Sequence, residues 1–216
     1  NPIFKYAPSQ GLAVALSQYS PGKDIWIANS QYKSKVIYTR DGSRGLNRAV
    51  REERLYLECS NCSYAITVEK NNEQNYIYNG SKIEKGSTIY CDACNRDTLG
   101  PAKIWLRPPG FAHIYNDRPA KASTPIEEIS YATPAKLKLP TSEINPNDWK
   151  QVNNKISSVK ERNYLLVTNK GPRDEGYNFC TECGRIDQFR GSRNPISGGA
   201  HQKPFPTKSG EETCVG

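Results

Sequence analysis

The sequence has no methionine, only two histidines, and a hydrophobic share of 36% over its 216 residues. That share is low for a compact enzyme domain. A chain with so little material for a core is expected to need another source of stability, such as bound metal. No apolar run approaches the roughly 20 residues of a membrane span, and no signal-peptide pattern is visible. We therefore expect a cytoplasmic protein without membrane contact.

Catalytic motifs are also missing. The chain has no Gly-rich P-loop with its Lys and Ser/Thr, which excludes a nucleotide-driven motor within this sequence. Ser/His/Asp catalysis would have only His113 and His201 to draw on. The acidic pairs Asp174-Glu175 and Glu211-Glu212 fall in predicted loops, where we expect them to be solvated. These absences predict a non-enzymatic protein with no small-molecule substrate.

Tyrosine, glycine and proline are abundant, with 13, 16 and 15 residues respectively. This composition favours short strands joined by turns, so the fold is predicted to be mainly β with short helices (α+β). One short helix is expected over residues 12–19, and residues 40–54 are predicted to be a basic loop. Residues 191–210 are expected to be loop-like. Strands are predicted at 24–28, 35–39, 55–59, 64–69, 76–78, 88–90 and, as a buried strand, 163–169, with a turn at 29–31.

Composition divides the chain into three parts. Residues 1–115 are predicted to be β-rich and contain the first cysteine pairs at 59–94. Residues 116–160, rich in Pro, Ser, Lys and Asn, are predicted to be a linker or an extended excursion. Residues 161–216 combine a strand with a second cysteine knuckle. Because the chain begins at Asn1 and ends just after Cys214, we expect a fragment of a larger protein.

Seven cysteines fall mainly into close pairs, which favours metal binding over disulfides. Cys59-x-x-Cys62 and Cys91-x-x-Cys94 are separated by 28 residues. Each Cys-x-x-Cys turn points two sulfurs to one side, so two turns complete the tetrahedral shell of a structural zinc ion. We predict a zinc ribbon at this place. The alternatives are two unrelated knuckles or disulfides; a catalytic zinc would keep an open position.

A second zinc site is predicted around Cys180-Thr-Glu-Cys183-Gly184. Gly184 can adopt the positive φ that such a turn needs, and Asn95 holds the same place in the first site. Seventeen residues separate Cys183 from His201, and 12 residues separate His201 from Cys214. We predict a Cys₃His site from Cys180, Cys183, His201 and Cys214. Alternatively His201 is free and the fourth ligand comes from elsewhere; His113 is the other candidate, although we expect it to be an ordinary half-buried histidine.

The net charge is +8, which permits contact with nucleic acid or an acidic partner. Between Lys33 and Arg54 lie seven Lys/Arg residues and three acidic residues. Phosphates could be contacted there by Arg40, Arg44, Arg48 and Arg51, and Tyr32 or Tyr38 could stack on a base. The competing interpretation is a solvated loop whose tyrosines pack in the sheet.

Several phrases together resemble a known family. They are Ala15–Gly22 (ALSQYSPG), Gln31–Ser34 (QYKS), Pro109–Phe111 (PGF) and Val167–Gly171 (VTNKG) leading to Tyr177–Gly184 (YNFCTECG), then His201 and Cys214. With the first cysteine pairs, they resemble the helicase-associated MrfA-type zinc-binding domain family, most closely its stand-alone form in the DISARM anti-phage system. The resemblance leaves residues 116–160 uncovered.

The resemblance implies an accessory module that binds zinc, partners a DEAD/DEAH-box (superfamily-2) helicase and helps hold DNA, in antiviral defence. Two other functions stay open from the sequence. One is a free-standing zinc-ribbon nucleic-acid binder in transcription or translation. The other is part of a hydrolase whose active site lies outside this chain.

Overall fold

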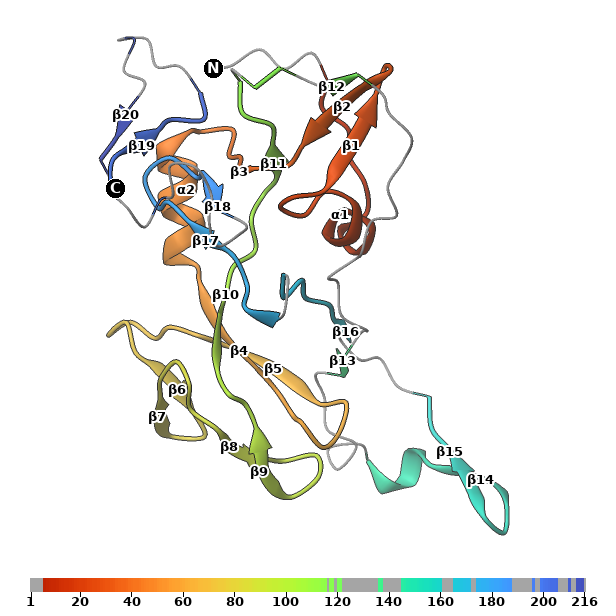
Figure 1. Ribbon diagram of the computed structural model, residues 1–216. Helices are drawn as coiled ribbons and strands as arrows, with labels where there is room; N and C mark the ends of the chain where they lie inside the picture. The colour runs from red at the N-terminus through yellow and green to blue at the C-terminus, as the bar shows by residue number, and fades with distance from the viewer. Residues whose placement is uncertain are drawn as a thin grey trace. The chain divides into compact units, whose positions relative to one another are not determined.

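The computed structural model describes residues 6–115, 117–118, 120–121, 136–137, 145–160, 165–171, 174–187, 196, 199–205, 210 and 213–215. They belong to two compact units. Unit 1 comprises Asn1–Arg51, Arg107–Thr133 and Thr168–Gly216, and unit 2 comprises Glu52–Leu106 and Pro134–Val167. Figure 1 shows the short, scattered strands of both units, which agree with the predicted mainly β fold with short helices.

Among its described residues, unit 1 contains two helices and four small sheets. The sheets have strand orders β1-β2-β12, β11-β3, β17-β18 and β19-β20, all antiparallel. The elements are α1 (Leu12–Gln18), α2 (Ser43–Arg51), β1 (Asp24–Ile27), β2 (Ser30–Lys33), β3 (Val36–Ile37), β11 (Phe111–Ala112), β12 (Ala120–Lys121), β17 (Asn178–Phe179), β18 (Ile186–Asp187), β19 (His201–Gln202) and β20 (Thr213–Cys214).

The helix predicted at residues 12–19 is confirmed as α1. The turn predicted at residues 29–31 is wrong, because the turn lies at residues 28 and 29. Ala28 and Asn29 have φ of 48° and 59° and form a two-residue hairpin turn. Positive φ at both central residues matches the twist of the flanking strands. Ile27 therefore pairs directly with Ser30, and β2 begins there.

The basic loop predicted at residues 40–54 is also wrong, because Ser43–Arg51 form the helix α2. Its buried residues are Leu46 and Ala49, which lie about one turn apart and anchor one face. Gly45 lies inside this helix although glycine is a poor helix former. A Cβ there would stand 2.6 Å from Thr39 Oγ1, so this position has no room for a side chain.

Unit 2 is built around the three-stranded antiparallel sheet β10-β4-β5, with two-stranded sheets β6-β7, β8-β9, β13-β16 and β14-β15. Its elements are β4 (Arg54–Glu58), β5 (Ala65–Glu69), β6 (Tyr76–Tyr78), β7 (Ser81–Ile83), β8 (Ile89–Cys91), β9 (Arg96–Leu99), β10 (Lys103–Trp105), β13 (Lys136–Leu137), η2, a 3₁₀ turn (Pro146–Asp148), β14 (Lys150–Asn153), β15 (Ile156–Ser158) and β16 (Leu165–Leu166).

The core of unit 2 is small and includes metal-ligand candidates. Leu55, Leu57 and Leu99 are fully buried, and Cys59 and Cys91 belong to the same cluster. A core that contains its own cysteines suits a unit in which a metal ion adds to limited hydrophobic stabilisation.

Three further sequence predictions need correction. The strand predicted at 35–39 is reduced to Val36–Ile37. The buried strand predicted at 163–169 is limited to Leu165–Leu166, where Leu165 is 62% exposed; residues 161–164 lie outside the described residues. The expected loop at 191–210 contains β19. Where the structure describes the chain, neither helix is long and apolar enough to cross a membrane.

Candidate metal centres

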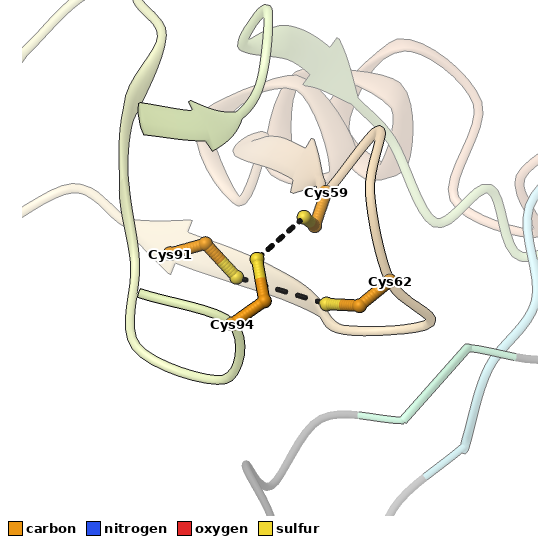
Figure 2. Close-up of side chains that lie close together, drawn as sticks. All are labelled: Cys59, Cys62, Cys91 and Cys94. Atoms are coloured by element: carbon orange, nitrogen blue, oxygen red, sulfur yellow. Dashed lines mark hydrogen bonds between the residues drawn. The ribbon is translucent and has the colours of Figure 1, made fainter. Parts of the chain in front are cut away.

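The first candidate centre brings together the four cysteines predicted from the sequence. Cys59 directly follows β4, and Cys62 lies in the turn before β5. Cys91 ends β8, and Cys94 lies in the turn before β9. Figure 2 shows the four side chains pointing toward one another. Two hairpin turns thus supply two sulfurs each.

The sulfur separations match a tetrahedral thiolate shell. The Sγ atoms of Cys59 and Cys94 are 3.6 Å apart, and those of Cys62 and Cys91 are 3.8 Å apart. All four lie within 4.8 Å of one another. Zinc–sulfur bonds of about 2.3 Å at tetrahedral angles put sulfurs about 3.8 Å apart. The cysteines therefore fit one metal ion without rearrangement.

The backbone joins the two turns to each other. The N–H of Ser60 donates to the carbonyl of Thr98 at 3.0 Å, and the N–H of Gly100 donates to the carbonyl of Glu58 at 3.0 Å. Cys59 and Leu99 form an antiparallel bridge. Asn95 has a φ of 55°, as its place after the second cysteine predicts, and its N–H donates to the Cys91 carbonyl. The ligand geometry is therefore held by main-chain hydrogen bonds.

Thr98, on β9, lowers the pKa of two of the cysteines and was not identified from the sequence. Its Oγ1 lies 3.1 Å from Cys59 Sγ and 3.6 Å from Cys94 Sγ. Burial opposes ionisation of Cys59, but hydrogen bonds from the Thr98 hydroxyl, the Asn61 N–H and Cys62 together outweigh burial and lower the pKa of this thiol to about 6. The Thr98 hydroxyl also lowers the pKa of Cys94. A hydrogen bond to the charged form favours that form.

The other two thiols of the centre behave in the opposite way. Burial raises the pKa of Cys62, and it raises the pKa of Cys91 to about 12. Four thiolates in one small volume repel one another, so without a cation some of them must stay protonated. A divalent cation would relieve this repulsion and displace the remaining protons.

The second candidate centre brings together four residues that lie between positions 180 and 214. Cys180 follows β17 and Cys183 lies in the turn before β18, while His201 starts β19 and Cys214 ends β20. Cys180, His201 and Cys214 are buried, and Cys183 is half-buried. The residues are those predicted as a Cys₃His set.

The geometry of the second cluster also fits a single ion. Cys180 Sγ and Cys214 Sγ are 3.8 Å apart, Cys183 Sγ and His201 Nε2 are 3.2 Å apart, and all four ligand atoms lie within 4.8 Å of one another. The Nδ1 atom of His201 lies 2.9 Å from the Gly199 carbonyl. Donation from Nδ1–H leaves the lone pair of Nε2 facing the sulfurs, which is the usual arrangement of a metal-bound histidine.

The second knuckle packs against β3 and α2 within unit 1. The N–H of Ile37 donates to the Gly184 carbonyl, and the N–H of Ile186 donates to the Lys35 carbonyl, both at 2.8 Å. Gly184 has a φ of 75°, and a Cβ there would lie 2.5 Å from the Ile37 oxygen and 3.5 Å from Leu46 Cδ2. Only glycine combines this conformation with this close approach.

His113 does not join either cluster. Its Nδ1 lies 3.0 Å from the Lys33 N–H nitrogen and its Nε2 lies 2.8 Å from the Asp117 carbonyl. It is half-buried, as expected, and bridges two backbone segments. The predicted nucleic-acid contacts lie outside both clusters. Arg40 precedes α2 and Arg44, Arg48 and Arg51 lie on it, all exposed.

Each cluster supplies four protein ligands, which is the number that fills a structural tetrahedral site. A catalytic ion would need a ligand position left for water or substrate. Thiolate and imidazole ligands in a tetrahedral arrangement select soft or borderline metals such as zinc over magnesium or calcium. Fold and clusters together define a β-rich module with two candidate metal centres, one in each unit.

Comparison with known proteins shows a distant similarity along nearly the whole chain. The chain is 26% identical over 221 residues to Druantia protein DruE from Escherichia coli (strain UMEA 4076-1). The aligned region covers 97% of this chain but 11% of the length of that relative. No family model matches the chain, and no solved structure matches it.

Proposed function

We propose that this chain is a non-catalytic zinc-binding module that partners a superfamily-2 helicase and helps it to hold DNA in anti-phage defence. The observation that carries the proposal is the pair of four-ligand clusters, one in each unit. Zinc is the metal of the proposal because closed sites of four thiolates, or of three thiolates and one imidazole, are the structural zinc sites of small folds.

The helicase and defence parts rest on resemblance. The chain resembles the MrfA-type helicase-associated family, in particular its stand-alone form DrmB, in the order of its short motifs. The similarity to Druantia protein DruE along nearly the whole chain is the second support. The nucleic-acid part is supported by the net charge of +8 and by the four exposed arginines at residues 40, 44, 48 and 51.

The metal content is tested by elemental analysis of the purified protein. Two zinc ions per chain are expected, and one ion would reject one of the centres. Cys59→Ser and Cys180→Ser should each lower the content to one. Structural zinc contributes about 10–16 kcal/mol of apparent binding free energy in small folds. Either variant melting like the unchanged protein would therefore contradict a structural role.

The partner is tested by purifying a tagged form of the chain from cells that express the neighbouring genes, with and without nuclease treatment. A superfamily-2 helicase that stays bound after nuclease treatment is the expected result. Recovery of RNA polymerase or ribosomal proteins in its place would favour the free-standing zinc-ribbon alternative. Hydrolytic activity that depends on a neighbouring gene product would favour the hydrolase alternative.

A further inference from the structure

The exposed face of α2 carries a set of side chains suited to DNA. At about 100° per residue, Arg44, Asn47, Arg48 and Arg51 fall within an arc of about 100°. All four are exposed, whereas Leu46 and Ala49 on the opposite side are buried. The helix contains no acidic residue. The sequence had shown these arginines only as a basic stretch; the helix puts them on one face and adds Asn47 to them.

The charge of this face is not neutralised within the described part of the chain. There, none of the guanidinium groups of Arg44, Arg48 and Arg51 forms an ion pair or a hydrogen bond with a carboxylate. Three free guanidinium groups along a single helix face attract a polyanion and release its counterions on binding. Charge complementarity therefore points to nucleic acid as the occupant.

The shape of the face favours the duplex form. Nine residues make a helix about 13.5 Å long and about 10–12 Å wide, which is the width that the major groove admits. Arginine pairs with guanine and asparagine with adenine through major-groove edges. Single strands are usually held by stacking on aromatic rings, and α2 has none. Tyr32 packs edge-on against His113, and Tyr38 packs edge-on against Phe205.

The second metal centre holds this helix in place. Leu46 lies against Gly184, the residue after the second knuckle cysteine, and β3 is hydrogen-bonded to the same knuckle. Figure 1 shows α2 beside the β17–β18 hairpin. The buried face of α2 is thus fixed to the Cys180–Cys183 turn, and the arginine face is left free.

We propose that α2 enters the major groove of double-stranded DNA, with Asn47 and the flanking arginines at the base edges. In this proposal the second metal centre fixes the position of α2. This inference rests on the proposed DNA contact. It adds the form of the DNA, the groove and the base-reading side chain.

The test uses the whole chain with a fluorescent 20-base-pair duplex and the matching single strand. Replacing Arg44, Arg48 and Arg51 together by Ala should weaken duplex binding by at least about tenfold and lower the salt slope by roughly one for each lost phosphate contact. The matched control replaces Lys150, Lys155 and Lys160, which are exposed in and around the β14–β15 hairpin, by Ala. It removes the same charge and should cost much less. Zinc content must stay at two in both variants.

Groove and base reading are measured separately. Bound protein should protect guanine N7 in the major groove from dimethyl sulfate and leave adenine N3 in the minor groove reactive. Asn47→Ala should keep the salt slope and change the base preference in selection from randomised duplexes. Tighter binding to single strands, minor-groove protection, or equal losses in the two triple variants would overturn the role of α2 while leaving a DNA-binding module. No binding to any DNA would reject the proposed DNA contact itself.

Discussion

His201 and Cys214 stand directly opposite each other in the β19–β20 ladder, and both side chains are buried in the second cluster. Two strands of two residues each have few hydrogen bonds to hold them together. A metal ion bound by both residues would cross-link the strands at their pairing point. We infer that the ion is what keeps this short ladder closed.

A ligand exchange at residue 201 tests this role. His201→Ala should reduce the zinc content from two ions to one, because the fourth ligand is lost. His201→Cys should retain both ions as a Cys₄ site. Cobalt substitution reports the change, since the ligand-field and sulfur-to-cobalt bands of the unchanged protein should show one Cys₄ and one Cys₃His site. Identical spectra for the unchanged protein and the Cys variant would mean that His201 is not a ligand.

Zinc affinity at the first centre should fall as pH falls. In the metal-free protein the pKa of Cys59 is lowered to about 6 and that of Cys91 is raised to about 12. Near neutral pH, Cys59 is already a thiolate, whereas Cys91 must lose its proton when the metal binds. Fewer than four protons should therefore be released per ion near pH 7.5. Below pH 6 Cys59 also starts protonated, so the affinity should fall more steeply with acid.

Proton release can be measured by calorimetry of zinc binding in buffers of different ionisation enthalpy. His201→Ala is a suitable background because it leaves the first centre complete and removes a ligand from the second. Four protons released at every pH between 6 and 8 would show that Cys59 is not a thiolate before the metal arrives.

Thr98→Val removes the hydroxyl near Cys59 and Cys94 and keeps the shape of the side chain. Zinc should still bind, because all four ligands remain. The affinity should drop by about 10- to 100-fold, as it does when other groups that hydrogen-bond to metal ligands are removed. Alkylation of the metal-free protein should show a higher pKa for Cys59. The control is Thr67→Val, at a half-buried threonine of β5. Equal losses of zinc affinity in the two variants would contradict a specific contribution of the Thr98 hydroxyl.

Two glycines with nearly identical φ angles test how tightly the second knuckle is packed. Gly184 has a φ of 75° and Gly176 has a φ of 76°, but a Cβ at Gly176 would meet nothing within 4 Å. Gly176→Ala should therefore cost only the strain of positive φ, about 1–3 kcal/mol. Gly184→Ala adds a contact of 2.5 Å with the Ile37 oxygen and should destabilise the protein further and weaken zinc binding at the second centre. Chemical denaturation with zinc present compares them; equal losses would mean that Gly184 tolerates a side chain.

The cysteine pattern predicted the membership of both clusters because a Cys-x-x-Cys turn has few geometries that suit its sulfurs. The same local rule predicted positive φ at Asn95 and Gly184. The ligands could be assigned to their two clusters without knowledge of the fold, since the spacing of the cysteines leaves few other combinations. The identity of the bound ion stays a proposal.

Features that depend on tertiary contacts could not be predicted. Glycine has a low helix propensity, so residue 45 argues against a helix in the sequence. The close approach of Thr39 nevertheless requires glycine at this position. Apolar residues at 164–167 predicted a buried strand, but burial depends on what covers a segment, and Leu165 is exposed. Thr98 belongs to no motif, because its role comes from the pairing of β9 with the residues that follow β4, which brings it to Cys59.

Unit 1 is assembled from three stretches of the chain, and the last of them provides the whole second centre. During synthesis, α2 leaves the ribosome long before Cys214 does, so the centre that positions this helix is completed only after more than 160 further residues have been made. Cleavage of the chain before Cys214, or a stop codon ahead of it, would therefore leave a helix more than 160 positions upstream without the centre that fixes it.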